Sequence, residues 1–128
     1  MLLAAVLALA AGLRLWQIDT PQLWEDDYLN LSRAALPAST IIAVQQQLGP
    51  ADTIYDLQPP LQFRLVRAAL AVHDSVLAAR LPSLAAGLAS ILGLALLGAA
   101  CAGRRAGLVA ALLCAGALFH IDISRSIK

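Results

Sequence analysis

The stretch Leu23-Trp24-Glu25-Asp26-Asp27-Tyr28 places three consecutive acids shortly after the first apolar segment of the chain. Crowded carboxylates repel one another, and beside an apolar region each costs free energy unless it is solvated or paired. The rest of the chain makes this stretch unusual, because the 128 residues are 60% hydrophobic and only 13% charged. A soluble domain is about a quarter charged, so the composition indicates a membrane protein.

The apolar segment before the acids covers residues 1–18 and is interpreted as a transmembrane helix. Arg14 and Trp16 near its end are typical of an interfacial anchor, with Arg14 snorkelling toward the headgroups. A cleaved signal peptide is the alternative, because Ala8-Leu9-Ala10 has a small-x-small pattern. No positive residue precedes the apolar run, which favours the anchor.

Two further apolar segments, residues 81–102 and 106–123, are joined by the short basic turn Gly103-Arg104-Arg105. They are expected to form a transmembrane hairpin, since about 20 apolar residues cross a bilayer. Small residues suited to close helix contact lie in the first of the two segments: Gly87, Ala89, Ser90, Gly93, Gly98 and Ala99. The arginines of the turn predict that it is cytoplasmic, which puts the loop of residues 19–80 outside a plasma (inner) membrane.

The outer loop is expected to contain juxtamembrane helices. Trp24–Ala35 carries Trp24, Tyr28, Leu31 and Ala35 on one face, so that Asp26 and Asp27 are expected to point away from it, toward a cavity or toward water. A short helix is predicted at Ile41–Leu48, and another from Leu61 to about Val72, with Arg64 and Arg67 on one side. The predicted fold is therefore an all-α membrane protein with one span, an external loop and a helical hairpin.

Several functional classes are disfavoured. A net charge of +1 gives no basic field for nucleic acid. Cys101 and Cys114 lie inside apolar segments and suggest neither a disulfide framework nor a metal site. A transporter fragment would be expected to carry acids within its spans, and Leu81–Ile121 has none.

The order of these motifs resembles the GT-C membrane glycosyltransferases, the group that includes protein O-mannosyltransferases and the aminoarabinose transferase of lipid A. Those proteins start with one span and a loop that opens with Trp-x-Asp-Glu. A His-Pro-Pro-like motif, an Arg-Leu-Pro-Ser entry into a span, a basic turn and a Phe-His-Ile ending follow. The matching stretches are Leu23-Trp24-Glu25-Asp26-Asp27, Gln58-Pro59-Pro60-Leu61, Arg80-Leu81-Pro82-Ser83, Gly103-Arg104-Arg105-Ala106-Gly107 and Phe119-His120-Ile121-Asp122-Ile123-Ser124. Family members are several times longer, so the resemblance implies an N-terminal part.

The resemblance implies a polyprenyl-phosphate-linked sugar as donor and a lipid, glycan or protein as acceptor. By position, Asp26 is the implied general base, flanked by Glu25 and Asp27. The alternative is that the three acids form only the solvated first turn of a helix, where negative charge is favourable. Some family members bind a divalent metal, but this chain shows no ligand set, and His120 is interpreted as an interfacial or packing residue.

Other residues are candidates for substrate binding. Arg64, Arg67 and Arg80 could grip the lipid phosphate, with interfacial snorkelling as the alternative for each. The chain departs from the family pattern at three places: Asp27 replaces a Glu, Gln58 stands where the family often has His or another polar residue before Pro-Pro, and Ser126 stands where a Glu is expected. Asp122, about one helical turn before Ser126, is the candidate to take the place of that Glu. Gln58 can hydrogen-bond a sugar or a phosphate but cannot act as an acid or base. A small non-enzymatic membrane subunit or assembly factor is the alternative function.

Overall fold

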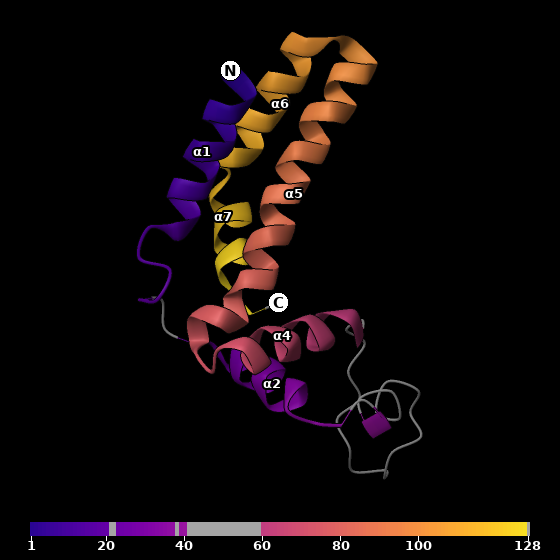
Figure 1. Ribbon diagram of the computed structural model, residues 1–128. Helices are drawn as coiled ribbons and strands as arrows, with labels where there is room; N and C mark the ends of the chain where they lie inside the picture. Colours follow the sequence, from indigo (N-terminus) through magenta and orange to yellow (C-terminus); the bar gives the residue numbers. More distant parts are fainter. Residues whose placement is uncertain (21–22, 38, 41–59, 128) are drawn as a thin grey trace. The chain divides into compact units, whose positions relative to one another are not determined.

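The computed structural model describes the chain except residues 21–22, 38, 41–59 and 128, and every helix or strand in the described part is an α-helix (Figure 1). The helices are α1 (Leu2–Leu15), α2 (Glu25–Ala34), α4 (Pro60–Val72), α5 (Val76–Ala102), α6 (Arg104–Gly116) and α7 (Leu118–Arg125). They belong to two compact units. The first consists of Met1–Gln22 and Ser83–Ser126, and the second of Leu23–Pro82 and Ile127–Lys128.

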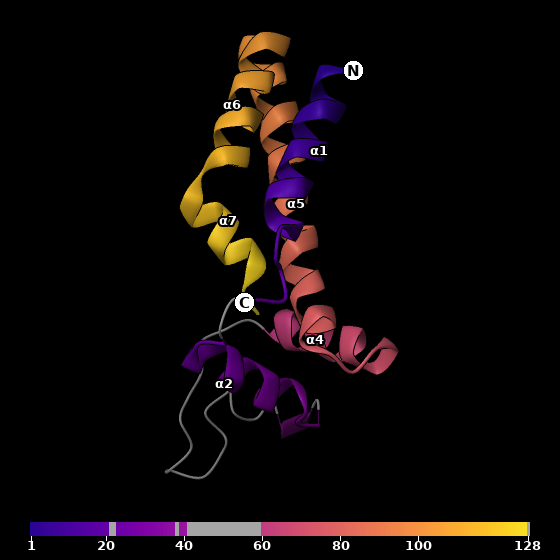
Figure 2. The ribbon, with the colours of Figure 1, turned by 90° about the vertical axis from the view of Figure 1, so that its left-hand side faces the viewer.

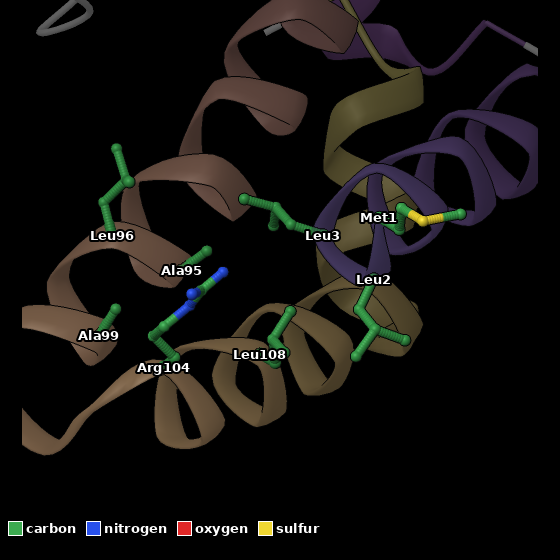
Figure 3. Close-up of a pocket in the computed structure, with 8 residues that line it drawn as sticks. All are labelled: Met1, Leu2, Leu3, Ala95, Leu96, Ala99, Arg104 and Leu108. Atoms are coloured by element: carbon green, nitrogen blue, oxygen red, sulfur yellow. The ribbon is translucent and has the colours of Figure 1, made fainter.

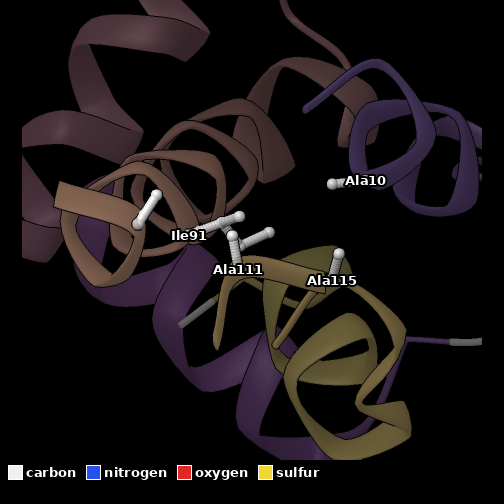
Figure 4. Close-up of a cluster of buried hydrophobic side chains, with 5 residues drawn as sticks. Ala10, Ile91, Ala111 and Ala115 are labelled. Atoms are coloured by element: carbon white, nitrogen blue, oxygen red, sulfur yellow. The ribbon is translucent and has the colours of Figure 1, made fainter. Parts of the chain in front are cut away.

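In the first unit, α1 lies along α6 and also packs against α7, as both Figure 1 and Figure 2 show. Beside the turn that joins α5 to α6, helices α1, α5 and α6 line a cavity of about 570 Å³ (Figure 3). The buried core further along these helices is built mostly of alanine, which lets the helix backbones approach closely. Figure 4 labels Ala10 of α1, Ile91 of α5, and Ala111 and Ala115 of α6, and Ala95 of α5 belongs to the same core.

The predicted hairpin turn is present. Gly103 has a φ of +87°, a left-handed conformation that glycine adopts at little cost, and it precedes the first residue of α6. Beyond the turn the two helices touch through their backbones, because a Cβ added to Gly98 would lie 2.9 Å from the Cα of Gly107. Of the small residues predicted for close contact, Gly98 therefore has this role, whereas a Cβ at Gly93 would meet no atom within 4 Å.

Helix α5 is long and apolar enough to cross a membrane. It begins at Val76, not at the predicted residue 81, because the Ser75 hydroxyl accepts a hydrogen bond from the Ala78 N–H at 3.1 Å and caps the helix. Pro82 lies inside the helix and does not mark its start. Helix α1 is apolar but shorter, with 14 residues.

The segment predicted as one helix at 106–123 is broken. Helix α6 ends at Gly116, α7 begins at Leu118, and the two are bent by 63°, although together they are apolar and long enough for one span. No proline lies at this break, and Gly116 at the end of α6 is a weak local signal that does not by itself predict a bend of this size. Its cause is found in side chains from other helices, described below.

The second unit packs α2 against α4 around a small core of Ala34, Val66, Ala79 and Ile127. The helix predicted from Leu61 to Val72 is confirmed as α4, with Pro60 at its first position, where a missing N–H costs nothing. The helix predicted within Trp24–Ala35 is confirmed as α2. The helix predicted at Ile41–Leu48 lies outside the described residues.

Candidate functional site

The three acids of the opening stretch form the first turn of α2, and the fold separates them. Glu25 and Asp26 are exposed, whereas Asp27 is only 1% exposed. One carboxylate oxygen of Asp27 accepts a hydrogen bond from the Trp24 N–H at 3.2 Å, and the other accepts one from the Ile127 N–H at 2.9 Å. Asp27 therefore closes the start of its own helix and also binds a distant part of the chain.

Asn30 completes this contact one turn further along α2. Its side-chain amide donates a hydrogen bond to the Ile127 carbonyl at 2.5 Å. Asp27 and Asn30 thus hold both backbone polar groups of Ile127, whose side chain is buried in the core of the second unit. We call this arrangement the Ile127 clamp. It gives Asp27 a structural role, and it leaves Glu25 and Asp26 at the surface of the same turn.

The aromatic side chains next to the acids are also at the surface. Trp24 is 72% and Tyr28 61% exposed, so α2 buries part of its polar side and exposes its aromatic residues. The sequence prediction that Asp26 and Asp27 both point toward a cavity or water is therefore wrong for Asp27. The reason is that Asp27 finds two backbone N–H partners, which offset the cost of burying a carboxylate.

The candidate arginines differ in their surroundings. Arg64 and Arg67 are exposed on α4, but Arg67 donates a hydrogen bond to the Leu36 carbonyl at 2.9 Å, just beyond the end of α2. Arg80 is buried in α5. Asp26 lies in the first turn of α2, about 15 Å along the helix axis from the level of Leu36. The structure therefore keeps Arg67 at the opposite end of α2 from Asp26.

Two candidates lie apart from this group. Asp122 is exposed on α7, in the first unit, whereas Asp26 belongs to the second. Gln58 lies outside the described residues. In the part of the chain that the structure describes, no group of three or more His, Cys, Asp or Glu side chains could hold a metal ion.

A polar network in the first unit was not predicted as a site. Arg14, expected to snorkel toward headgroups, is 0% exposed. Its guanidinium donates to the Ala10 and Ala115 carbonyls, each at 3.1 Å, and lies 2.6 Å from Nδ1 of His120. A weaker bond at 3.5 Å reaches the Cys114 carbonyl. The interfacial interpretation of Arg14 is therefore wrong.

The hydrogen bonds assign the protonation of the His120 ring. An arginine only donates, so Nδ1 of His120 accepts and the ring proton sits on Nε2. Nε2 then donates to the Ser90 hydroxyl at 2.8 Å, and that hydroxyl donates to the Gly87 carbonyl at 2.8 Å. The chain Arg14–His120–Ser90–Gly87 has one consistent direction of donation, and it joins α1, α7 and α5.

This network explains the break between α6 and α7. The last carbonyls of a helix lack intrahelical partners, and here Arg14 takes those of Ala115 and Cys114. Arg125 acts in the same way on α1, donating to the Trp16 and Gln17 carbonyls at 2.9 and 2.8 Å. A charged residue within an apolar segment was the signal that pointed to Arg14, because such residues commonly face a bundle interior.

Comparisons of the chain with protein-family models, with curated proteins and with solved structures find no match.

Proposed function

We propose that this chain is the N-terminal part of an integral membrane glycosyltransferase that moves a sugar from a polyprenyl-phosphate carrier to an acceptor hydroxyl on the outer face of the membrane. One observation carries the proposal. In the first turn of α2 the buried Asp27 is engaged in the Ile127 clamp, while Asp26 is exposed on the side of the helix that points away from Trp24 and Tyr28. The same short helix thus exposes a carboxylate on one side and, on another side, two aromatic residues of the kind that lie at a membrane interface.

In the proposed reaction, the Asp26 carboxylate takes the proton of the acceptor hydroxyl as its oxygen attacks the anomeric carbon. The bond from the anomeric carbon to the phosphate oxygen breaks, and its electron pair leaves with the polyprenyl phosphate. Attack opposite the leaving group inverts the anomeric centre. Arg64, exposed on α4, is the proposed contact for the phosphate, because guanidinium pairs well with phosphate oxygens.

The exposed face of α4 supports a location at the membrane surface. At about 100° per residue, Leu61, Leu65, Ala68 and Val72 fall on one face about 60° wide, with Arg64 beside it. All four are exposed, while Phe63 and Val66 are buried on the other side. An apolar stripe bordered by a cation is typical of a helix that lies in the interface plane. Only residues 73–75 separate α4 from α5, the candidate span.

A non-enzymatic membrane subunit or assembly factor is the second candidate. The Ile127 clamp favours it, because the clamp gives one of the three acids a purely structural purpose. Reading the genomic frame past Lys128 is the first test. A continuation into many further spans supports the enzyme, and a stop codon favours the subunit.

The decisive experiment compares Asp26→Asn with Glu25→Gln in the full-length protein. Both changes remove one exposed charge from the same turn, so Glu25→Gln is the matched control. In membranes supplied with a polyprenyl-phosphate sugar, Asp26→Asn is expected to lower transfer by about 10²–10⁴-fold, the usual range for losing a general base. Membrane insertion should be unchanged. Normal transfer by Asp26→Asn, or an equal loss in both variants, would overturn the assignment of Asp26.

A further inference from the structure

The cavity in the first unit has an unusual composition. Its walls are apolar and come from three helices, including Leu2 and Leu3 of α1, Leu96 of α5 and Leu108 of α6. Among the described residues that line the cavity, the charged side chain is that of Arg104, which extends from the start of α6 into the cavity (Figure 3). The volume of about 570 Å³ falls within the range of roughly 300–1,000 Å³ that is usual for small-molecule sites.

Arg104 has no counter-charge there. Among the residues that the structure describes, no side chain or carbonyl forms a hydrogen bond or ion pair with it, and no acid lines the cavity. A guanidinium cannot lose its proton in a protein, so it stays charged beside these apolar walls. Arg104 is itself exposed, and a cation at the open edge of an apolar cavity is suited to an anion that carries an apolar portion of its own.

We propose that this cavity binds an anionic phospholipid, with the lipid phosphate on Arg104 and part of an acyl chain against Leu2, Leu3 and Leu96. Guanidinium forms bidentate hydrogen bonds with phosphate oxygens. Basic pockets between membrane helices on the cytoplasmic side are suited to anionic headgroups, and the turn beside Arg104 is the one assigned to that side by its charges. The site depends on membrane insertion, but it does not depend on sugar transfer.

The adjacent arginine provides a matched control. Arg105 is exposed in the same turn of α6 but does not line the cavity. The chain is reconstituted in nanodiscs of phosphatidylcholine and phosphatidylglycerol. The protein is then released from the nanodiscs, and the lipids that remain bound to it are counted by native mass spectrometry. Wild-type protein and Arg105→Gln should retain phosphatidylglycerol in preference to phosphatidylcholine. In Arg104→Gln the preference for phosphatidylglycerol over phosphatidylcholine should be about fivefold lower, as expected for the loss of one basic residue near an anionic surface.

A second pair of variants tests the apolar part of the site. Leu96 and Leu97 are adjacent on α5 and 60% and 62% exposed, but only Leu96 lines the cavity. Leu96→Trp fills the space and should lower lipid retention, whereas Leu97→Trp should not. Equal effects of the two arginine variants would reduce the site to a general surface charge and overturn the proposal. A dimer mass that Leu96→Trp abolishes would show that a second copy of the chain occupies the cavity, and it would overturn the proposal too.

Discussion

Neighbouring residues on a helix point about 100° apart, so Asp26 and Asp27 meet different surroundings although their carboxylates are chemically alike. The sequence shows the acids but not this difference, because the partner of Asp27 is the backbone of Ile127, 100 residues further along the chain. Helical periodicity placed both acids opposite the aromatic residues. It could not indicate that the polar side of α2 would find donors and become buried.

Substituting Asp27 tests the Ile127 clamp. In Asp27→Asn the side chain can no longer accept from both Trp24 and Ile127, because one of its two polar atoms becomes a donor. The free energy of unfolding should fall by about 1–3 kcal/mol, the usual cost of a buried group left without its partner. Denaturant unfolding in detergent micelles, followed by tryptophan fluorescence, measures it. The exposed Glu25→Gln, in the same turn of α2, should stay within about 0.5 kcal/mol of wild type. Equal losses in the two variants would contradict the clamp.

The Arg14 network predicts a spectroscopic signature. The chain has two histidines, His73 and His120, so the ring nitrogens of His120 can be assigned by ¹⁵N NMR with a His73→Gln variant. Wild-type His120 should carry its proton on Nε2 and accept at Nδ1 from Arg14. In Arg14→Met, which keeps the side-chain bulk but removes every donor, the Nδ1 signal should move toward that of a free ring. A protonated Nδ1 in wild-type protein would disprove the assigned direction of donation.

At the scale of the elements, the hairpin turn could be predicted and the helix break could not. The turn is coded locally by Gly103 between two apolar segments, so short-range reasoning is sufficient. The break after Gly116 depends on Arg14, which lies about 100 positions earlier and takes the carbonyls that end α6. Periodicity and propensity describe a helix in isolation, whereas here its end is set by a side chain from another helix.

The close contact of α5 with α6 yields a prediction for this pair of helices. A Cβ at Gly107 would lie 2.8 Å from the Ala99 nitrogen and would also collide with the Ala95 carbonyl, so Gly107→Ala forces the backbones apart. The expected loss is about 1–3 kcal/mol of unfolding free energy, as for other overpacked sites. Gly93→Ala is the matched control in open space. It should be neutral or stabilising by up to about 1 kcal/mol, because alanine favours the helix. Thermal unfolding in micelles distinguishes the two variants. A Gly107→Ala protein as stable as wild type would rule out the backbone contact.

At the scale of the whole molecule, the composition predicts association with a membrane more securely than it predicts how many times the chain crosses that membrane. Among the described residues, helix α5 has the length and hydropathy of a span by itself, α6 and α7 reach them only as a bent pair, and α1 is shorter. At the ends of such short or bent helices, backbone carbonyls need hydrogen-bond partners from outside the helix. Arg14 and Arg125 supply such partners for carbonyls at the end of α6 and just beyond the end of α1.

The two native cysteines test the proposed orientation. Cys101 is exposed near the basic turn, whereas Cys114 is half-buried in the apolar part of α6. If the turn is cytoplasmic, a membrane-impermeant maleimide should label inverted vesicles at Cys101 and leave right-side-out vesicles unlabelled. The label should persist in Cys114→Ser and disappear in Cys101→Ser.

A second labelling experiment uses a chain without the two native cysteines. In that chain, Thr20→Cys should react only from the outside, since residue 20 opens the proposed outer loop and is exposed. Labelling of Cys101 from outside would reverse the orientation and move Asp26 to the cytoplasmic side. Reaction of both positions from the same side would mean that the chain crosses the membrane an even number of times between them, or not at all, which contradicts the three proposed spans.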